Sequence, residues 1–225
     1  ALDANTTGAS NTAVGHYSTI SNTTASNNTA VGQCSLYTNT TGANNTAVGK
    51  DALLANSTGF SNVSVGQGAL QANTTAGNNT AIGRVAGNKT TTGCQNVAIG
   101  TFAHCVNTTG DNNVAIGVCS LCNNTTADNN TAVGFQSLYA NTTGAGNVSL
   151  GHSSMYSNTT GNYNIGIGRS TLQNNTTACY NTAVGYLALE ANTTGTALVA
   201  IGDRALSANT TANNNIAIGQ QSMVT

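Results

Sequence analysis

The six cysteines of this chain are the residues whose spacing most directly suggests chemistry. Cys105 and Cys122 are separated by one 17-residue period, the period on which the whole sequence is built, as described below. In a structure that stacks one coil per period, their Cα atoms would lie about 4.8 Å apart, the spacing of neighbouring strands. That distance is inside the window of roughly 4.4–6.8 Å that a disulfide requires. We therefore predict a disulfide between Cys105 and Cys122; two stacked free thiols are the alternative.

The other four cysteines form two pairs, Cys34 with Cys119 and Cys94 with Cys179, and the members of each pair are separated by five such periods. Five coils correspond to about 24 Å, which is too far for a disulfide within one chain. Two copies of the chain that are offset by five coils would bring both pairs together. These four residues are therefore candidates for disulfides between chains.

Redox and zinc sites find less support in the sequence. The Cys119-x-x-Cys122 motif would need a helix N-terminus to stabilise a thiolate, and no segment has a helical pattern. The three histidines are His16, His104 and His152, and no zinc-binding spacing connects them with the cysteines. We interpret them as surface histidines.

A possible N-glycosylation sequence, Asn-Thr-Thr or Asn-Ser-Thr, occurs in twelve of the periods. Its asparagine could instead stack into an internal ladder, and sugars on every coil would crowd at a spacing of about 4.8 Å. Many Ser and Thr residues could also carry O-linked sugars. The candidate N-linked acceptors are Asn5, Asn22, Asn39, Asn56, Asn73, Asn107, Asn124, Asn141, Asn158, Asn175, Asn192 and Asn209.

An enzyme is not expected, and neither is a cofactor. The six acidic residues are scattered, and no nucleophile, histidine and acid are suggested together. Only 5% of the residues are charged, and a net charge of −1 gives no field to attract nucleic acid or an anionic membrane. No run approaches the roughly 18 consecutive apolar residues of a membrane span.

A glycine that returns once in every 17-residue period organises the chain. Thirteen periods without insertion or deletion are typical of a solenoid, in which each coil buries its apolar face only against the next. We therefore predict an all-β fold, a parallel β-solenoid (β-roll) of about thirteen 17-residue coils. The repeating glycines are Gly15, Gly32, Gly49, Gly66, Gly83, Gly100, Gly117, Gly134, Gly151, Gly168, Gly185, Gly202 and Gly219.

Each coil is numbered here from position 1 to the glycine at position 17. Position 16 is always Val, Ile or Leu, position 14 is Thr, Val or Ile, and position 15 is Ala, Ser or Gly. Positions 14 and 16 therefore share one strand face, and position 15 lies on the other. If positions 14 and 16 fill the interior, the small residues at position 15 allow a neighbouring chain to pack closely. Position 4, mostly Leu or Met, is a second apolar anchor.

Polar positions repeat as strictly as the apolar ones. Position 9 is always Thr, position 8 is Thr apart from Ser57, position 7 is Asn except at Thr90, and position 13 is Asn except at Leu198. Identical side chains stacked at about 4.8 Å can form hydrogen-bonded ladders. Gly or Ala at position 10 and Gly at position 17 mark corners. We expect three short strands, near positions 3–4, 7–9 and 13–16, between three solvated bends that hold most of the charges.

The sequence predicts a single repeat array over residues 1–225. A longer period lies within it, because Asn62–Ser64 recurs as Asn147–Ser149 and Arg84 recurs as Arg169, in both cases five periods later. We interpret this as the duplication of a five-coil block, residues 16–100 and 101–185. The main breaks in the pattern are Arg84–Lys89 and Thr196–Val199.

The run Asn-x-Ala-Val/Ile-Gly, as in Asn45–Gly49, Asn96–Gly100 and Asn113–Gly117, resembles the head repeats of trimeric autotransporter adhesins. Similar arrays also resemble repeats of phage and viral tail-fibre-like proteins. The resemblance covers the whole chain, although the adhesin coil is shorter and the additional residues here carry Asn-Thr-Thr. It implies a left-handed parallel β-roll, export, display on a cell or virion surface, and binding through a long repetitive face.

These observations favour a structural role outside the cell. We expect a subunit or segment of an extracellular fibre, which assembles with copies of itself head to tail and in a lateral or trimeric arrangement. The chain starts at Ala1 and stops within a coil, so we expect a processed chain or part of a longer array, with strand edges open at its ends. The alternative is an adhesin or a tail-fibre binding stalk. An ice-binding solenoid is less favoured, because neighbouring Thr residues at positions 8 and 9 face opposite sides.

Overall fold

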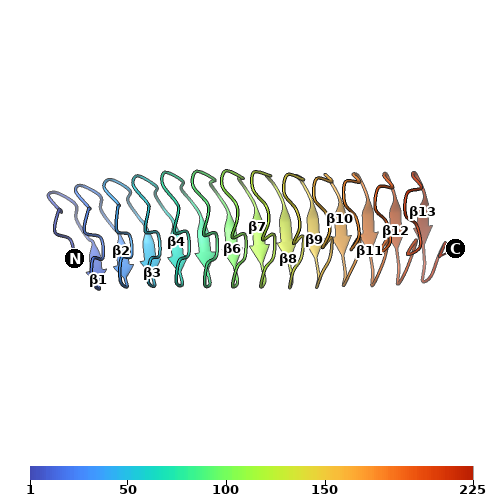
Figure 1. Cartoon of the computed structure of the whole chain (residues 1–225), viewed down its shortest axis with the longest axis horizontal. Helices are drawn as coiled ribbons and strands as arrows, with labels where there is room; N and C mark the ends of the chain where they lie inside the picture. The colour runs from blue at the N-terminus through green and yellow to red at the C-terminus, as the bar shows by residue number, and fades with distance from the viewer. Residues whose placement is uncertain (225) are drawn as a thin grey trace. The chain divides into compact units, whose positions relative to one another are not determined.

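The fold is a parallel β-solenoid, as the sequence predicts. The computed structural model describes residues 1–224, and each 17-residue period forms one coil with one three-residue strand at positions 14–16 (Figure 1). The described residues form no helix. The chain divides into two compact units, unit 1 (Ala1–Asn112) and unit 2 (Asn113–Thr225).

The strands follow the period without exception in the described residues. Unit 1 contains β1 (Thr12–Val14), β2 (Thr29–Val31), β3 (Thr46–Val48), β4 (Val63–Val65), β5 (Thr80–Ile82) and β6 (Val97–Ile99). Unit 2 contains β7 (Val114–Ile116), β8 (Thr131–Val133), β9 (Val148–Leu150), β10 (Ile165–Ile167), β11 (Thr182–Val184), β12 (Val199–Ile201) and β13 (Ile216–Ile218).

Within each unit, successive strands pair in parallel at equal coil positions. In unit 1, Thr12 aligns with Thr29 and Val14 with Val31, and in unit 2, Ile165 aligns with Thr182. Because every coil has the same length, each side chain stacks on the side chain at the same position of the next coil. Columns of equal residues are thus a direct consequence of the constant period.

The structure contradicts the arrangement in which the side chains at positions 14 and 16 fill the interior, because these side chains point outward and position 15 points inward. Position 15 is buried: Ala30, Ala81 and Ser149, for example, have no exposed surface. The Val, Ile, Leu and Thr residues at positions 14 and 16 point outward and are half-buried or exposed. The interior is too narrow for them. A Cβ atom on Gly166, at position 15, would already lie 2.8 Å from Ser154 Oγ and 3.2 Å from Met155 Cε.

The prediction of three strands per coil is wrong, because only positions 14–16 form a strand. The non-glycine residues at positions 2, 4 and 12 adopt left-handed backbone conformations with φ between 46° and 62°, so the chain turns where an extended segment was expected. Such a conformation costs an L-residue on the order of 1 kcal/mol. Asn tolerates it best and is common at position 12, as at Asn27, Asn44 and Asn129.

Glycine at position 17 is required for two reasons. Its φ lies between 123° and 137° in every coil, a region that other residues rarely adopt. The coils also approach most closely here: a Cβ on Gly32 would lie 2.5 Å from the carbonyl oxygen of Gly49. The strict glycine period thus reflects a corner where backbone stacks directly on backbone.

The apolar part of the core consists of position 4 packed near the small residues at positions 3 and 15. Leu36, Leu53, Leu138 and Leu189 at position 4 are fully buried, which confirms this position as the second apolar anchor. Burying a Leu side chain contributes on the order of 2 kcal/mol. Most coils bury one such side chain, which makes a thin core, so polar contacts must supply the rest of the cohesion.

Asn at position 7 forms a buried hydrogen-bonded ladder, which confirms that prediction. In unit 2, Asn158 Nδ2 donates to Asn141 Oδ1 over 2.9 Å and to the carbonyl oxygen of Gly161 over 3.0 Å. The same two bonds recur from coil to coil, with Asn-to-Asn distances of 2.8–3.0 Å from Asn141 to Asn209. Each amide is thereby tied both to its own coil and to the preceding one.

Asn at position 13 forms a second ladder that links each coil to the next. Asn45 accepts the backbone N–H of Asn62 over 3.0 Å and donates from Nδ2 to the carbonyl oxygen of Gly59 over 2.9 Å. Gly59, at position 10, also accepts from Asn56 Nδ2. The two Asn ladders thus converge on the position-10 carbonyl, which explains how so many polar groups are accommodated in the interior.

The position-7 ladder has a defect at Thr90. This residue is 1% exposed, and its Oγ1 atom and Asn73 Oδ1 are buried without a hydrogen-bond partner. In other coils an Asn at this position would donate to the Oδ1 of the preceding coil. An unsatisfied buried polar atom costs roughly 1–3 kcal/mol. Thr90 therefore makes the protein less stable than an Asn at this position would.

We predict that Thr90→Asn stabilises the protein by about 1–3 kcal/mol, because the new Nδ2 satisfies Asn73 Oδ1 and removes the buried hydroxyl. Denaturant unfolding of the variant and the unsubstituted chain measures the difference. Thr92→Asn, at exposed position 9 of the same coil, is the control and should change stability little. A Thr90→Asn variant no more stable than the unsubstituted chain would contradict the ladder account of this coil.

Candidate interaction surfaces

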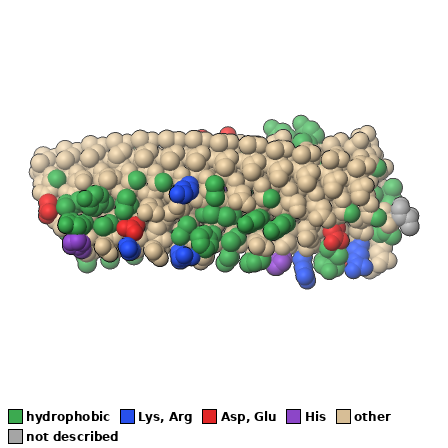
Figure 2. Space-filling view, viewed as in Figure 1, with side chains coloured by type: hydrophobic (Ala, Val, Ile, Leu, Met, Phe, Trp, Pro, Cys, Tyr) green, Lys and Arg blue, Asp and Glu red, His purple; other side chains and the backbone are tan. Residues whose placement is uncertain are grey.

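The outward face of the strands is a regular apolar surface in each unit. We call the side chains at positions 14 and 16 of β7–β13 the unit 2 strand face. Twelve of its fourteen residues are Val, Ile or Leu, none is charged, and Leu150 is 45% exposed. Contiguous apolar surface of this kind marks an interaction site in most soluble proteins. Figure 2 shows hydrophobic side chains exposed along one part of the molecular surface.

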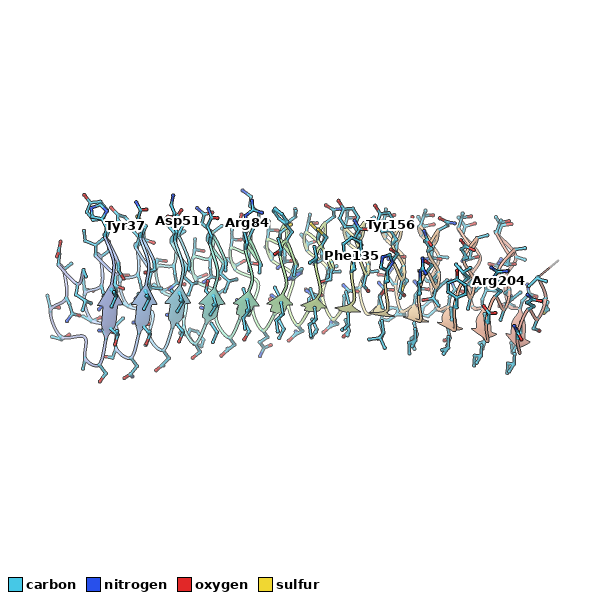
Figure 3. All side chains as sticks on the ribbon, turned by 90° about the horizontal axis from the view of Figure 1, so that it is seen from below. Tyr37, Asp51, Arg84, Phe135, Tyr156 and Arg204 are labelled. Atoms are coloured by element: carbon cyan, nitrogen blue, oxygen red, sulfur yellow. The ribbon has the colours of Figure 1, made fainter. Side chains whose placement is uncertain are left out.

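A second exposed surface lies on the bends, where aromatic side chains gather. In unit 2 the rings of Tyr139 and Tyr156 stack at 5.1 Å, and those of Phe135 and His152 also stack at 5.1 Å. Tyr156, like Tyr37, Asp51 and Arg84 of unit 1, projects outward from the bends in Figure 3. Aromatic and Arg side chains are enriched at protein interfaces. This surface varies from coil to coil, unlike the strand face.

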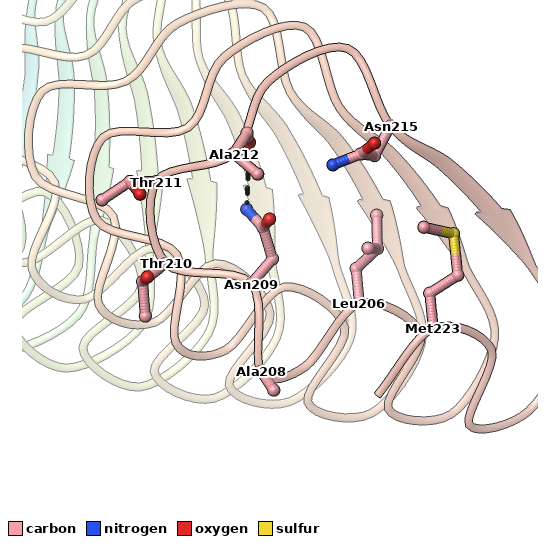
Figure 4. A pocket seen from close by; sticks show the side chains of 8 residues that line it. All are labelled: Leu206, Ala208, Asn209, Thr210, Thr211, Ala212, Asn215 and Met223. Atoms are coloured by element: carbon pink, nitrogen blue, oxygen red, sulfur yellow. Dashed lines mark hydrogen bonds between the residues drawn. The ribbon is translucent and has the colours of Figure 1, made fainter. Parts of the chain in front are cut away.

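An open hollow of about 310 Å³ lies in the last complete coil of the chain (Figure 4). Asn209, Asn215, Leu206 and Met223 line it, together with backbone and side chains of residues 208 and 210–212. Asn209 Nδ2 donates to Asn192 Oδ1 and to the carbonyl oxygen of Ala212. The hollow is therefore the interior of a coil on which no further coil of the described residues stacks.

The ladders have a direction, so the first and last coils present complementary groups. Along the position-7 ladder, Nδ2 of one Asn donates to Oδ1 of the Asn in the preceding coil. Asn5 Nδ2 donates only to the carbonyl oxygen of Gly8, which leaves one N–H available. Within the described residues no donor reaches Asn209 Oδ1. A coil of the same kind placed against either end would satisfy these groups.

The candidate N-glycosylation acceptors are the asparagines of the position-7 ladder. Ten of them, from Asn22 to Asn192, have no exposed surface, and Asn5 and Asn209 in the outermost coils are half-buried. The Nδ2 atom that would carry a sugar donates hydrogen bonds inside the coil. In the folded chain this geometry fits the ladder interpretation, and glycosylation at these sites stays a prediction.

The neighbouring threonines at positions 8 and 9 have different environments. The hydroxyl at position 8 donates to the carbonyl oxygen of position 8 in the next coil, as from Thr159 to Thr176 over 3.0 Å. The residue at position 9 is exposed in every coil, for example Thr143 and Thr160. Each coil between the outermost two thus offers one exposed threonine of this pair, whereas an ice-binding surface of Thr-x-Thr pairs needs two.

Cys105 lies in unit 1 and Cys122 in unit 2, where they are half-buried and buried, respectively. The disulfide between them stays a prediction. Cys34, Cys94, Cys119 and Cys179 are half-buried free thiols, and the pairing of these four between chains also stays a prediction.

The structure gives two of these cysteines a local role. Cys94 Sγ and Cys179 Sγ, both at position 11, accept the backbone N–H of position 11 in the preceding coil, from Gly77 over 3.5 Å and from Asn162 over 3.2 Å. Asp111 Oδ1 accepts from Cys94 N in the same way. Position 11 therefore serves as an acceptor column at the bend, a role that the sequence pattern did not reveal.

Burial raises the pKa of the Cys119 thiol, and the nearby Cys122 raises it further. A thiol–disulfide exchange centre needs the opposite shift, toward a stable thiolate. This direction agrees with the absence of a helix next to the Cys119-x-x-Cys122 motif in the described residues.

The interpretation of all three histidines as surface residues is wrong for His104. His16 and His152 are exposed, whereas His104 is fully buried at position 4, where most coils have Leu. Burial lowers the pKa of His104 to about 3, because the charged imidazolium would lose its hydration. The histidine is therefore neutral at physiological pH and acts as part of the core.

In the part of the chain that the structure describes, no group of three or more His, Cys, Asp or Glu side chains is placed to hold a metal ion. Nor do residues 1–224 contain a helix that is long and apolar enough to cross a membrane.

No protein-family model matches this sequence, and searches among curated proteins and solved structures find no similar protein.

We predict that His104→Leu makes the stability of the protein less dependent on pH. The folded pKa of His104 is depressed to about 3, so below pH about 6.5 the unfolded chain binds a proton that the folded chain excludes. The unsubstituted protein should therefore lose roughly 1.4 kcal/mol per pH unit relative to the variant, from about pH 6 downward. Above pH 7 the difference should be constant.

Denaturant unfolding of both proteins at pH 4.5 to 8 measures this difference. Met155→Leu, at buried position 4 of another coil, is the matched control: it removes no titratable group and should leave the pH profile unchanged. A constant stability difference between His104→Leu and the unsubstituted chain across this range would show that His104 accepts a proton in the folded state.

Proposed function

We propose that this chain is a structural subunit or segment of an extracellular fibre, displayed outside the cell or on a cell or virion surface. The observation that carries the proposal is the directional Asn ladder, in which the side-chain amide of each coil donates to the preceding coil and accepts from the next. In unit 2, Asn158 donates to Asn141 and accepts from Asn175 in this way. Coils of a further segment or a second copy continue the ladders without any new type of contact.

The composition and the inward-facing groups support the same role. The coil interior is filled by the Asn ladders and, in most coils, by one Leu or Met side chain at position 4. The open hollow at the last coil is closed by a stacked coil in this proposal. A repeat of constant length is suited to extension, because each added coil buries the same groups as the previous one.

A second candidate is an adhesin or a tail-fibre binding stalk, as the resemblance to adhesin head repeats implies. The irregular bend surface favours it: Phe135, Tyr139 and Tyr156 are aromatic groups of the kind that anchor partners. In this alternative the repeat holds the bend surface at a distance from the cell, and the strand face remains available for a trimeric arrangement. Sugars on exposed hydroxyls are compatible with both candidates.

Cryo-electron microscopy of the full chain at high concentration tests the proposal. We expect filaments in which coil layers about 4.8 Å apart continue across the subunit junctions. Asn215→Arg places a charged side chain at the open hollow and should abolish the filaments. The matched control, Thr194→Arg, alters an exposed residue of the preceding coil that does not line the hollow and should preserve them.

Discrete particles at all concentrations, which bind to cells or to purified surface glycans, would instead establish the adhesin alternative. Filaments that form equally well with Asn215→Arg would contradict assembly through the coil ends.

A further inference from the structure

We infer that the unit 2 strand face is a self-association surface, on which a second copy of this chain packs to form a two-layer β-sandwich. This lateral contact goes beyond the proposed function, because it uses the flank of the coils and not their ends. Either contact can exist without the other.

The side chains at positions 14 and 16 point outward and expose apolar surface. In β9 and β10, Leu150 is 45% exposed, Ile165 is 38% exposed and Ile167 is 36% exposed. The same columns continue through the remaining strands of unit 2, with Thr131 and Thr182 as the two hydroxyl-bearing members. A solvated strand face is usually polar, so a face of twelve aliphatic residues is unusual in an isolated solenoid.

The size of the face is sufficient for a stable dimer. Fourteen side chains that each bury on the order of 60 Å² give about 800 Å² per copy, which equals the contribution of one partner to an interface of standard size. Its composition resembles that of the buried centre of an interface, where charged residues are depleted. The columns contain no charged side chain, so two copies meet without repulsion.

The regular pitch of the face favours a second copy over an unrelated partner. A partner must present apolar side chains along a flat surface at a spacing of about 4.8 Å to fill the grooves between successive coils. The same face of another copy meets this requirement, and sheets packed face to face at about 10 Å interdigitate in this way. A two-fold arrangement also closes on itself, since both copies use the same surface.

The bends next to the strand face extend the contact. Position 1 follows the strand directly after the glycine at position 17. In unit 2 it holds three large apolar side chains, Val118, Phe135 and Tyr186, which are 43%, 46% and 43% exposed, alongside the polar residues His152, Arg169, Asp203 and Gln220. These larger side chains flank the aliphatic columns on one side. They supply the bulky anchors that concentrate binding energy in protein interfaces.

Analytical ultracentrifugation of the full chain tests the inference. It is performed in the Asn215→Arg background as well as in the unsubstituted chain, so that growth through the ends is separated from lateral pairing. The mass of one chain is 22.4 kDa, so we expect a species of about twice that mass, in equilibrium with the monomer at micromolar concentrations. Leu150→Lys with Ile167→Lys should raise the dissociation constant at least 100-fold.

Two further variants keep the test interpretable. Thr143→Lys with Thr160→Lys adds the same charges to exposed position 9 of the same two coils and should leave the dimer intact. Leu150→Thr with Ile167→Thr, which introduces a residue native to position 14, should weaken the dimer about tenfold without added charge. Circular dichroism should show the same fold in all variants.

A monomer at all concentrations in the Asn215→Arg background would overturn the inference, even if the unsubstituted chain forms filaments. A dimer that survives the Leu150→Lys and Ile167→Lys substitutions, or a trimer in its place, would also overturn it. Loss of filaments with the lateral dimer retained would contradict only the proposed function.

Discussion

The hydrogen bond between asparagine side chains of successive coils is the interaction on which the rest of the structure depends. Most coils bury one large apolar side chain, such as Leu138, which is too little to hold the backbone in a closed loop. The bond from Asn158 to Asn141 and its equivalents add a directional contact between coils. Because a slip of one residue would leave these buried amides unpaired, the ladders also fix the register, and the register keeps the period constant.

The residues inside the coil also determine which residues lie on its surface. With Asn at positions 7 and 13 and Leu at position 4 inside, only a small residue fits at position 15, so the larger residues of the strand must face solvent. The narrow loop also forces left-handed conformations at positions 2, 4 and 12, each with an energetic cost that the stacking contacts offset. The apolar strand face therefore results from a polar, narrow core.

Much of this architecture could be predicted from the sequence, but not which face of each strand is buried. The period, the parallel stacking, the Asn ladders and the Leu column follow from residues that recur at fixed positions. The faces of Thr12–Val14 and its equivalents could not be assigned, because alternation states which residues share a face and not which face is buried. His104 was misplaced for a related reason: its burial follows from its position in the Leu column, not from its residue type. No signal in Leu36 or Leu53 indicates a left-handed backbone, since this conformation is imposed by the closure of the coil.

Side-chain amide hydrogen exchange, followed by NMR on the full chain, tests the central claim most directly. If buried asparagine ladders hold the coils together, the Nδ2 protons of Asn158 and Asn164 should exchange more than about 100-fold more slowly than those of Asn44 and Asn129, which are exposed at position 12. Amide protons at position 7 that exchange as fast as those at position 12 would show that the ladders are open to water and would contradict the account.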